Sequence, residues 1–530
     1  MLQSREGMRT LSGSRVIVVG AGPGGLATAL LLARAGLHVT VLERDAAVGG
    51  RTKTVEAPGG YRFDIGPTFF LYPQILADIF ASCGERLEDH VALKRLDPQY
   101  HLVFEGEGGR SSEIRATGDL DRLEAEIARI APQDARNLRS FFAENRKKLS
   151  KFKPVLEQPF DSLLSMASPA MLTALPHLHP GRSVEGDLKR FFADPRVRLA
   201  FSFQTKYLGM SPFRCPSLFT ILSFLEYEHG VYHPVGGCGA VSEAMAGLAR
   251  RMGVDIRLNT PAEQVLFENG KASGVAVPGE TLKADAVVIN GDFAKVVPQI
   301  VPEAYRPRWR DAKVDKARLS CSTYMLYLGI EGRMPEALGH HTILLARDYR
   351  RNIEEITGGV LPMEPSLYVQ HAGFTDGGMA PPGHTALYVL VPVPNLKAGI
   401  DWAAVGPAYR RLVLDRLRLL GIEDIEERIR YERVVDPRGW RDDFAVHEGA
   451  TFNLAHDLGQ MLWFRPHNRF GHGLYLVGGG THPGSGLPVI YEGARISARL
   501  LIEDLAGRRA PEVLAELPAT QPLATQGEPS

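Results

Sequence analysis

The stretch Val16-Ile-Val-Val-Gly20-Ala-Gly22-Pro-Gly24-Gly25 decides the fold. Its β-branched residues predict a strand, its glycines follow the GxGxxG spacing, and an Ala/Leu-rich helix is expected over residues 26–35. Glycines at these positions allow a tight turn and close approach to a pyrophosphate, which the N-terminus of the helix would bind. The stretch therefore predicts an α/β, Rossmann-type dinucleotide-binding unit with Gly20, Gly22, Gly24 and Gly25 at the ligand.

The next strand, expected over residues 39–42, ends in an acidic residue and is followed by a second glycine turn. Glu43 lies near the spacing of about 20 residues at which a carboxylate binds ribose hydroxyls. Arg44 follows it, and Gly49-Gly50-Arg51-Thr52 comes soon after. Folds that bind NAD usually lack this second turn, whereas in flavoproteins with two dinucleotide-type domains it approaches FAD, where an arginine offers charge-assisted donors. We therefore predict FAD, with Glu43, Arg44, Gly50 and Arg51 among its contacts; a solvated Arg51 is the alternative.

The composition limits the class of protein. A chain of 530 residues with 44% hydrophobic and 23% charged residues is long enough for several packed units. Its formal net charge of zero gives no field that would attract nucleic acid. The four cysteines form no CxxC pair, which argues against a zinc site or a disulfide framework and favours a reducing compartment. No apolar run reaches the roughly 20 residues that span a bilayer. We expect a soluble protein or one on a membrane surface.

The segment Phe63-Asp64-Ile65-Gly66-Pro67-Thr68 resembles the FDxGPT signature of the bacterial-type phytoene desaturases, which are FAD-dependent carotenoid desaturases. The resemblance covers nearly the whole folded chain. It continues in Gly230-Val-Tyr-His-Pro-Val-Gly-Gly-Cys-Gly-Ala240, His340-His-Thr342, Tyr388-Val-Leu-Val-Pro-Val-Pro394, Trp463-Phe-Arg-Pro-His-Asn-Arg469 and Leu474-Tyr-Leu-Val-Gly-Gly-Gly-Thr-His-Pro-Gly484.

The resemblance implies further contacts to FAD. A rigid loop would lie near the isoalloxazine, a strand backbone near the adenine and a glycine-rich strand end near the phosphates and ribityl chain. A helix N-terminus would then face the flavin and stabilise its anionic reduced form. In this order, the residues concerned are Gly66, Pro67 and Thr68; Val265; Gly479, Gly480 and Thr481; and Leu487 and Pro488.

The resemblance and the pattern of elements together suggest how the chain is divided. We expect a discontinuous FAD-binding domain, a β-sheet substrate domain and a mainly helical insertion whose aromatic and basic residues fit either a core or a membrane-docking lip. The FAD-binding pieces are 1–95, 230–300 and 426–508, the insertion is 96–229, the substrate domain is 301–425, and 509–530 is a disordered tail.

The resemblance implies stepwise desaturation of a linear polyisoprenoid such as phytoene. Hydride would pass to flavin N5 in a dry apolar tunnel, and a proton would follow. A quinone or oxygen would reoxidise the flavin, in a cytoplasmic protein held on the inner membrane. The sequence identifies no proton acceptor: Asp64 and Glu492 are candidates by position only, so the catalytic residues stay unassigned. The histidine spacing suits no metal site, and a solvated cluster is one interpretation of Arg465 and its neighbours.

Several alternatives remain open. The segment 488–493 reads Pro-Val-Ile-Tyr-Glu-Gly where the family pattern has Pro-Gly-Val-Ile, which leaves a shorter C30 substrate (diapophytoene or squalene) possible in place of C40. A carotene oxidase or ketolase is a neighbouring possibility. A flavin amine oxidase shares the GxGxxG, Glu43 and GGR elements. A flavin-binding protein without turnover is the non-enzymatic alternative.

Overall fold

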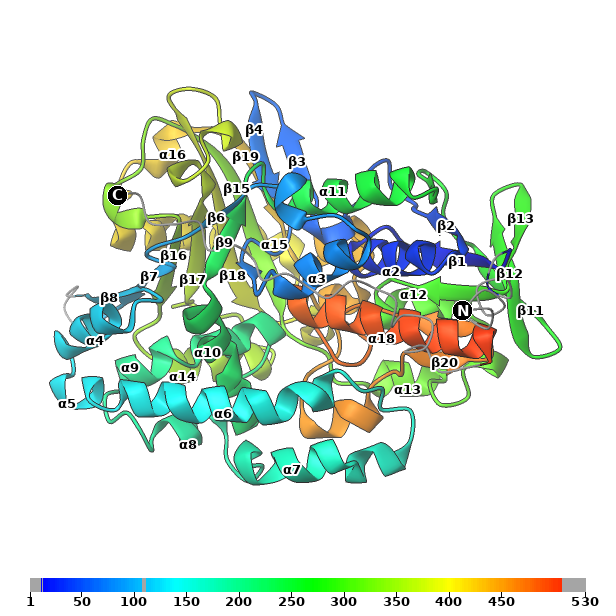
Figure 1. Ribbon diagram of the computed structural model, residues 1–530. Coiled ribbons are helices and arrows are strands. Elements are labelled where there is room, and N and C mark those ends of the chain that lie inside the picture. The colour runs from blue at the N-terminus through cyan, green and yellow to red at the C-terminus, as the bar shows by residue number, and fades with distance from the viewer. Residues whose placement is uncertain (1–10, 12, 107–110, 508–530) are drawn as a thin grey trace.

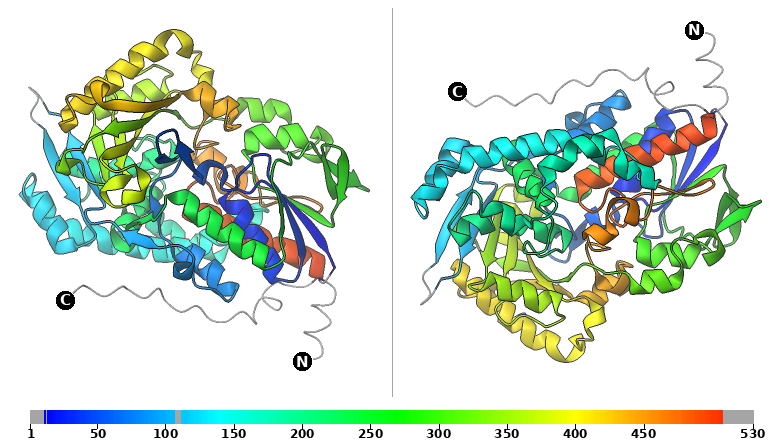
Figure 2. Two further views of the ribbon diagram at one scale, coloured as in Figure 1. Left: turned by 90° about the horizontal axis from the view of Figure 1, so that it is seen from above. Right: turned by 90° about the horizontal axis from the view of Figure 1, so that it is seen from below.

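A computed structural model describes residues 11, 13–106 and 111–507. The expected tail at 509–530 lies outside the described residues. Two large sheets and a group of helices make up most of the molecule. Figures 1 and 2 show the sheets at opposite ends, and in Figure 1 α6 runs below the mixed sheet toward α18. The helices are α2 (Pro23–Arg34), α3 (Gln74–Ser82), α4 (Leu120–Ala128), α5 (Pro132–Ala135), α6 (Leu138–Leu156), α7 (Pro169–Leu178), α8 (Val184–Leu188), α9 (Pro195–Ala200), α10 (Thr220–His229), α11 (Cys238–Arg251), α12 (Phe293–Ile300), α13 (Asp311–Lys316), α14 (Tyr349–Thr357), α15 (Trp402–Leu417), α16 (Ile425–Arg428), α17 (Pro437–Asp442) and α18 (Leu487–Ala506).

The first sheet is the predicted dinucleotide-binding sheet. Its strand order is β10-β2-β1-β14-β21-β20, parallel except for the edge strand β20. The strands are β1 (Arg15–Val19), β2 (His38–Leu42), β10 (Asp255–Arg257), β14 (Ala286–Ile289), β20 (Arg469–Gly471) and β21 (Leu474–Leu476). Segments from both ends and the middle of the chain therefore form one sheet, which is the Rossmann-type architecture expected from the sequence.

Helices cover one face of this sheet and a small sheet with further helices covers the other. Val16 and Val18 pack among α2, α11 and α18, whereas Ile17 and Val19 face α12 and the small sheet. This alternation follows from the two-residue period of a strand, and burial on both faces explains why β1 is apolar after its exposed first residue, Arg15. The small sheet consists of β11 (Gln264–Glu268), β12 (Lys271–Val277) and β13 (Glu280–Lys283).

The second large sheet is mixed and has the order β19-β15-β18-β17-β16-β7-β8. All its pairs are antiparallel except β16 with β7. The strands are β7 (Tyr100–Phe104), β8 (Ser112–Ala116), β15 (Ser322–Glu331), β16 (His341–Leu345), β17 (Leu367–His371), β18 (His384–Val393) and β19 (Ile429–Val435). The remaining strands are β3 (Thr54–Ala57) with β4 (Tyr61–Asp64), and β5 (Phe70–Leu71), β9 (Val231–Pro234) and β6 (Leu93–Arg95).

Three strands of the mixed sheet come from segments that were expected to belong elsewhere. β7 and β8 lie in the expected helical insertion at 96–229, yet they extend the sheet because the buried run Leu102–Phe104 pairs along β16. β19 lies in the expected FAD-binding piece at 426–508, but it pairs with β15. These strands lack the strong alternation that would separate an edge strand from a loop in the sequence. None of the helices in the described residues is long and apolar enough to cross a membrane.

Candidate functional site

The predicted dinucleotide site lies at the carboxyl ends of the parallel strands. Gly20 follows β1, Glu43 follows β2, Asn290 follows β14 and Gly478 comes soon after β21. Since these strands are parallel, their carboxyl ends share one edge, where ligands of open α/β sheets bind. The structure therefore brings residues that are up to 458 positions apart in the sequence to one edge of the sheet.

Close packing against Asn290 explains the first glycine turn. Gly20 has φ +100°, and a Cβ there would lie 2.3 Å from the Asn290 backbone oxygen. A Cβ on Gly22 or Gly25 would come within 2.9 Å of the Asn290 side-chain amide. Sequence reasoning missed Asn290, although its position at the end of a predicted strand was a usable signal. The helix α2 begins here with no side chain capping its N-terminus. Its free amide donors fit a diphosphate.

A second uncapped helix N-terminus approaches the first. α18 begins at Leu487 with Pro488 in its first turn, after Gly486 with φ +104° and no side-chain cap. A Cβ on Gly24 would lie 3.0 Å from Ile490 Cγ2, so the first turns of α2 and α18 are in contact. Two positive helix ends at one place suit an anionic cofactor. The donor set thus fits FAD.

Glu43 is buried at the end of β2. Its Oε2 accepts a hydrogen bond from the Ala21 amide at 2.8 Å, and its Oε1 accepts one from the Asp45 amide at 3.0 Å. Arg44 points away from this turn: it forms an ion pair with Asp45 at 3.3 Å and its side chain is 43% exposed. Val265 lies on β11, where it is buried in the core of the small sheet and pairs with β12. The roles of these residues at FAD stay predictions.

The second glycine turn contacts the first. The Gly49 amide donates to the Ala21 carbonyl at 2.8 Å, and a Cβ on Gly50 would lie 3.5 Å from Gly22 Cα. Arg51 extends from this turn and donates to the Thr451 carbonyl at 2.9 Å. Its side chain is therefore held inside the fold, not solvated as the alternative interpretation had it.

The FDIGPT loop is held to the mixed sheet by three tyrosine hydroxyls. Tyr327 donates to the Ile65 carbonyl at 2.6 Å, and Tyr388 donates to the Gly66 carbonyl at 2.8 Å. The Thr68 and Tyr368 hydroxyls are 2.6 Å apart. Sequence reasoning placed these tyrosines on strands forming a pocket wall but assigned them no contacts.

Gly66 sits where this loop passes the second glycine turn. A Cβ on Gly66 would lie 2.6 Å from the Arg51 backbone oxygen, so this position accepts no larger residue without movement. Pro67 follows it directly and restricts the backbone. The loop is consequently fixed between the dinucleotide-binding sheet and the mixed sheet, where a flavin ring would have to lie to meet a substrate.

Arg465 forms hydrogen bonds with the glycine-rich segment that follows β21. This guanidinium has no exposed surface and donates to the Gly479 carbonyl at 2.6 Å and to the Thr481 carbonyl at 3.2 Å. Burial lowers the pKa of Arg465 to about 9, which leaves it cationic at neutral pH. The interpretation as part of a solvated charge cluster is therefore wrong for this residue. Gly480 is packed tightly, since a Cβ there would lie 2.5 Å from Phe293 Cβ.

The two carboxylates proposed by position have different surroundings. Asp64 is buried, and its Oδ1 accepts hydrogen bonds from the Thr54 hydroxyl at 2.6 Å and the Cys238 amide at 2.8 Å. Burial raises the pKa of Asp64 to about 6. Glu492, in α18, pairs with Arg495 at 3.3 Å, and burial raises its pKa. Asp64 thus accepts a hydrogen bond from the amide of Cys238, the first residue of α11. Its position in the motif did not predict this structural role.

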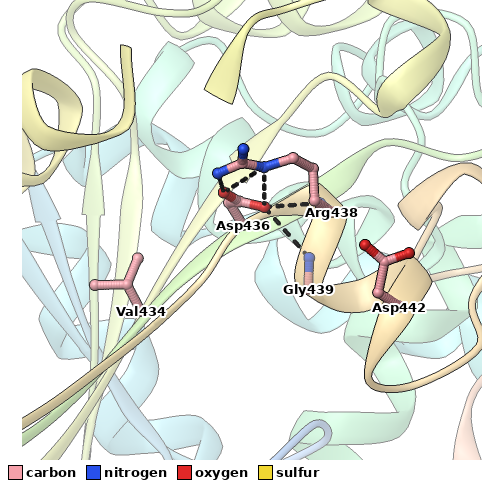
Figure 3. A pocket seen from close by; sticks show the side chains of 5 residues that line it. All are labelled: Val434, Asp436, Arg438, Gly439 and Asp442. Atoms are coloured by element: carbon pink, nitrogen blue, oxygen red, sulfur yellow. Dashed lines mark hydrogen bonds and ion pairs between the residues drawn. The ribbon is translucent and has the colours of Figure 1, made fainter. Parts of the chain in front are cut away.

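Other candidate sites are accounted for by internal pairing. In the described residues, Glu144, His179 and Asp187 form the one group with metal-ligand spacing, but Lys148 and Arg190 each lie 2.9 Å from the Asp187 carboxylate. Figure 3 shows a surface pocket at the end of β19 and α17. Arg438 forms an ion pair with Asp436 there, with 2.7 Å between nitrogen and oxygen. That pocket contains none of the residues predicted to bind FAD; it is lined by Val434, Asp436, Arg438, Gly439 and Asp442.

Comparisons with known proteins indicate the family to which the chain belongs. A family model described as flavin containing amine oxidoreductase matches residues 23–502. The chain is 41% identical over 491 residues to a 4,4'-diapophytoene desaturase (4,4'-diapolycopene-forming) from a Methylomonas species, covering 92% of this chain and 94% of the relative. It is 40% identical over 499 residues to the all-trans-zeta-carotene desaturase of Myxococcus xanthus, covering 92% and 93%.

A third relative and a solved structure extend the comparison. The neurosporene-forming phytoene desaturase of Rhodobacter capsulatus is 35% identical over 512 residues, covering 94% of this chain and 95% of the relative. A putrescine oxidase structure aligns with a TM-score of 0.58 at 16% identity, covering 93% of this chain and 99% of the other. At that identity the structural match establishes the fold alone.

Proposed function

Because this chain belongs to the flavin-containing amine oxidoreductases and, within them, to the bacterial-type carotenoid desaturases, we propose that it desaturates a linear carotenoid precursor such as phytoene, with FAD as cofactor. One observation carries the proposal: relatives named as desaturases of this kind match more than nine-tenths of the chain at 35–41% identity. The fold and the two converging helix N-termini support it, since they fit the cofactor that such chemistry needs.

The cofactor, when bound, would supply the hydride acceptor, and the residues of the chain would position the cofactor and the substrate. The glycine turns and the first turns of α2 and α18 would hold the diphosphate, with Glu43 at the ribose. The clamped Gly66-Pro67-Thr68 loop would fix the flavin side of the substrate tunnel. Correct placement of an allylic C–H group in a dry site is worth several kcal/mol of activation free energy. A reaction that depends mainly on placement explains why the site consists largely of rigid backbone turns and has few acid–base pairs.

A C30 substrate is the second candidate, favoured by the 41% identity to a relative named 4,4'-diapophytoene desaturase. The test is expression in a bacterial host supplied separately with phytoene or with the C30 precursor, followed by absorption and mass analysis of the extracts and a flavin spectrum of the purified protein. Conjugated products from one pool identify the substrate length. Bound FAD with no change in either pool would contradict desaturation.

We also propose that the protein docks on the cytoplasmic face of the inner membrane, where the apolar substrate resides and where a quinone, or else oxygen, reoxidises the flavin. Exposed apolar side chains on α7 and on two neighbouring short helical turns support this surface. They are Leu163 (62% exposed), Leu164 (81%), Leu172 (60%), Leu175 (45%) and Phe464 (47%). α7 lies at the lower edge of Figure 1, away from the bulk of the molecule.

Vesicle flotation tests the docking surface. The double variant Leu164→Glu/Leu172→Glu should lose most binding to anionic phospholipid vesicles, because each change places a charge in the acyl boundary. The matched control is Val360→Glu/Met363→Glu, which alters residues that are 55% and 67% exposed on a different loop. Equal binding by both variants would remove α7 from the proposal.

A further inference from the structure

A row of buried polar side chains leads away from the FDIGPT loop across the mixed sheet. The Thr68 hydroxyl lies 2.6 Å from the Tyr368 hydroxyl, which in turn lies 2.7 Å from His341 Nδ1. Tyr368 is on β17 and His341 is on the neighbouring strand β16. His341 is 1% exposed, and its ring stacks on Phe69 with centroids 4.1 Å apart. The ring is therefore fixed in place with Nδ1 toward the tyrosine.

The row continues through two more imidazoles to a carboxylate. The His340 ring lies 4.4 Å from the His341 ring and 4.7 Å from the His233 ring, between centroids. His233 has no exposed surface, and its Nε2 lies 3.2 Å from Asp376 Oδ2. These side chains thus lie between the loop at the predicted flavin and a turn between β17 and β18. His340 packs between the other two rings, but its own nitrogens face the Thr375 hydroxyl at 2.7 Å and the Gln370 amide at 3.4 Å.

Asp376 lies at the far end of the row and is itself buried, with 6% of its surface exposed. Its carboxylate accepts hydrogen bonds from the Gly236 amide at 2.7 Å and the Gly378 amide at 3.1 Å. These bonds and His233 lower its pKa, so it is an anion at neutral pH. Its neighbours Phe374 and Gly377 are exposed. The turn consequently places a stable negative charge close to the surface.

Packing alone does not account for these histidines. Among the described residues, His341 Nε2 and His233 Nδ1 have no hydrogen-bond partner, although both nitrogens are buried. Buried nitrogens of this kind are normally paired, often through an ordered water. Burial holds the pKa of His341 well below its usual range and also lowers that of His233, so both rings are neutral and have a nitrogen able to accept a proton.

We propose that Tyr368, His341 and His233 form a proton relay that carries the proton released in desaturation from the Thr68 loop to Asp376. The inference rests on the proposed function, which requires that each new double bond release one proton besides the hydride. It deepens that function by supplying the proton route that the sequence left unassigned. Neutral histidines are suited to such transfer because each ring accepts at one nitrogen and donates at the other.

The atoms and charges in this proton transfer balance. A substrate –CH2–CH2– unit becomes –CH=CH–, losing one hydride to the oxidised flavin and one proton to the hydroxyls of Thr68 and Tyr368. The Tyr368 hydroxyl passes a proton to His341 Nδ1. A bridging water would then carry the Nε2 proton of His341 to His233 Nδ1, since both nitrogens are buried without a partner among the described residues. The Nε2 proton of His233 then moves to the Asp376 carboxylate, which releases it to solvent. No residue is oxidised or reduced.

The test uses the purified holoenzyme in anaerobic single turnover with its identified precursor. Tyr368→Phe and His341→Gln should slow formation of the conjugated product about hundredfold, while the loss of flavin absorbance is slowed less, because hydride transfer precedes the blocked proton step. The product step should also acquire a larger solvent deuterium isotope effect. Tyr409→Phe is the matched control, since it removes a buried phenol whose hydroxyl has no partner in the described residues.

A second readout is independent of turnover. In protein labelled with ¹⁵N-histidine, NMR should show His341 as the Nε2–H tautomer, and Tyr368→Phe should shift its Nδ1 resonance whereas Tyr409→Phe should not. Product formation in Tyr368→Phe and His341→Gln as fast as in Tyr409→Phe would overturn the relay. So would a rate loss that merely follows lost FAD. A wild-type protein that desaturates neither precursor but shows the NMR pattern would instead contradict the proposed function.

Discussion

Replacing Arg465 with methionine should separate stability from cofactor binding. The guanidinium is wholly buried, and in the described residues it forms no ion pair. Its two shorter hydrogen bonds go to the backbone of the Gly479–Thr481 loop, and two longer ones of 3.5 Å go to the Gln460 and Leu454 carbonyls. Arg465→Met keeps much of the side-chain volume but removes both the charge and the donors.

Two opposing effects set the magnitude. Leaving the Gly479 and Thr481 carbonyls without their partner costs about 1–3 kcal/mol each, or roughly 2–6 kcal/mol together. Against this, burial lowers the pKa of Arg465 to about 9, a drop that corresponds to roughly 5 kcal/mol of cost in burying its charge. The two effects oppose each other, so the free energy of unfolding of the apoprotein should change by no more than about 3 kcal/mol. FAD affinity should still fall about ten- to hundredfold, because the Gly479–Thr481 loop loses its hydrogen bonds to the guanidinium and a nearby positive charge is removed.

Urea unfolding of the apoprotein and fluorescence titration with FAD measure the two quantities. Arg469→Met is the control: it comes from the same segment but pairs with Asp504 at 2.8 Å near the surface, so it should cost at most about 1 kcal/mol and leave FAD affinity unchanged. Arg465→Lys keeps the positive charge but loses the forked guanidinium donors, so its FAD affinity should lie between that of the wild type and that of Arg465→Met. An Arg465→Met protein that binds FAD as tightly as Arg469→Met would refute the reasoning.

Three further outcomes are expected. Since burial raises the pKa of Asp64 to about 6 from about 3.9 unfolded, the folded state binds its proton more tightly, so the free energy of unfolding should fall by about 2 kcal/mol between pH 4 and 6. Asp64→Asn should flatten that dependence in urea melts. Gly66→Ala, whose Cβ would lie 2.6 Å from a backbone oxygen, should lower the FAD content of the purified protein, whereas Gly247→Ala in α11, with no neighbour closer than 3.9 Å, should raise stability by about 0.5–1 kcal/mol in thermal melts. Lys148→Met breaks a fully buried ion pair of 2.9 Å with Asp187 and should cost about 3–5 kcal/mol by calorimetry.

The sequence predicted the parts of the fold that depend on neighbouring residues. The turn at Gly20–Gly25 and the helix that begins near Pro488 both follow from local rules for glycine, proline and strand pattern. Gly20 has a positive φ, as a tight turn there requires. Such features need no knowledge of the remaining chain.

Contacts between distant residues were beyond those rules. Arg465 looks like a surface residue because its partners are carbonyls, which have no sequence signature, and the chain folds over it. The pairing of Tyr368 with Thr68 spans 300 residues and depends on how β17 meets the FDIGPT loop. The sequence identified the loop and the strand separately, but their meeting is decided by the packing of the two sheets.

The order of strands in the dinucleotide-binding sheet also governs when the protein becomes functional. β14 pairs with β21, which ends at residue 476, and α18 packs on α2 only after residue 487. During synthesis one edge of β14 and an apolar side of α2 therefore stay uncovered until residues 474–506 have been made. Open sheet edges and apolar surfaces of this kind favour aggregation and chaperone binding. We expect a chain that stops before residue 474 to bind no cofactor, because it lacks β21 and the first turn of α18.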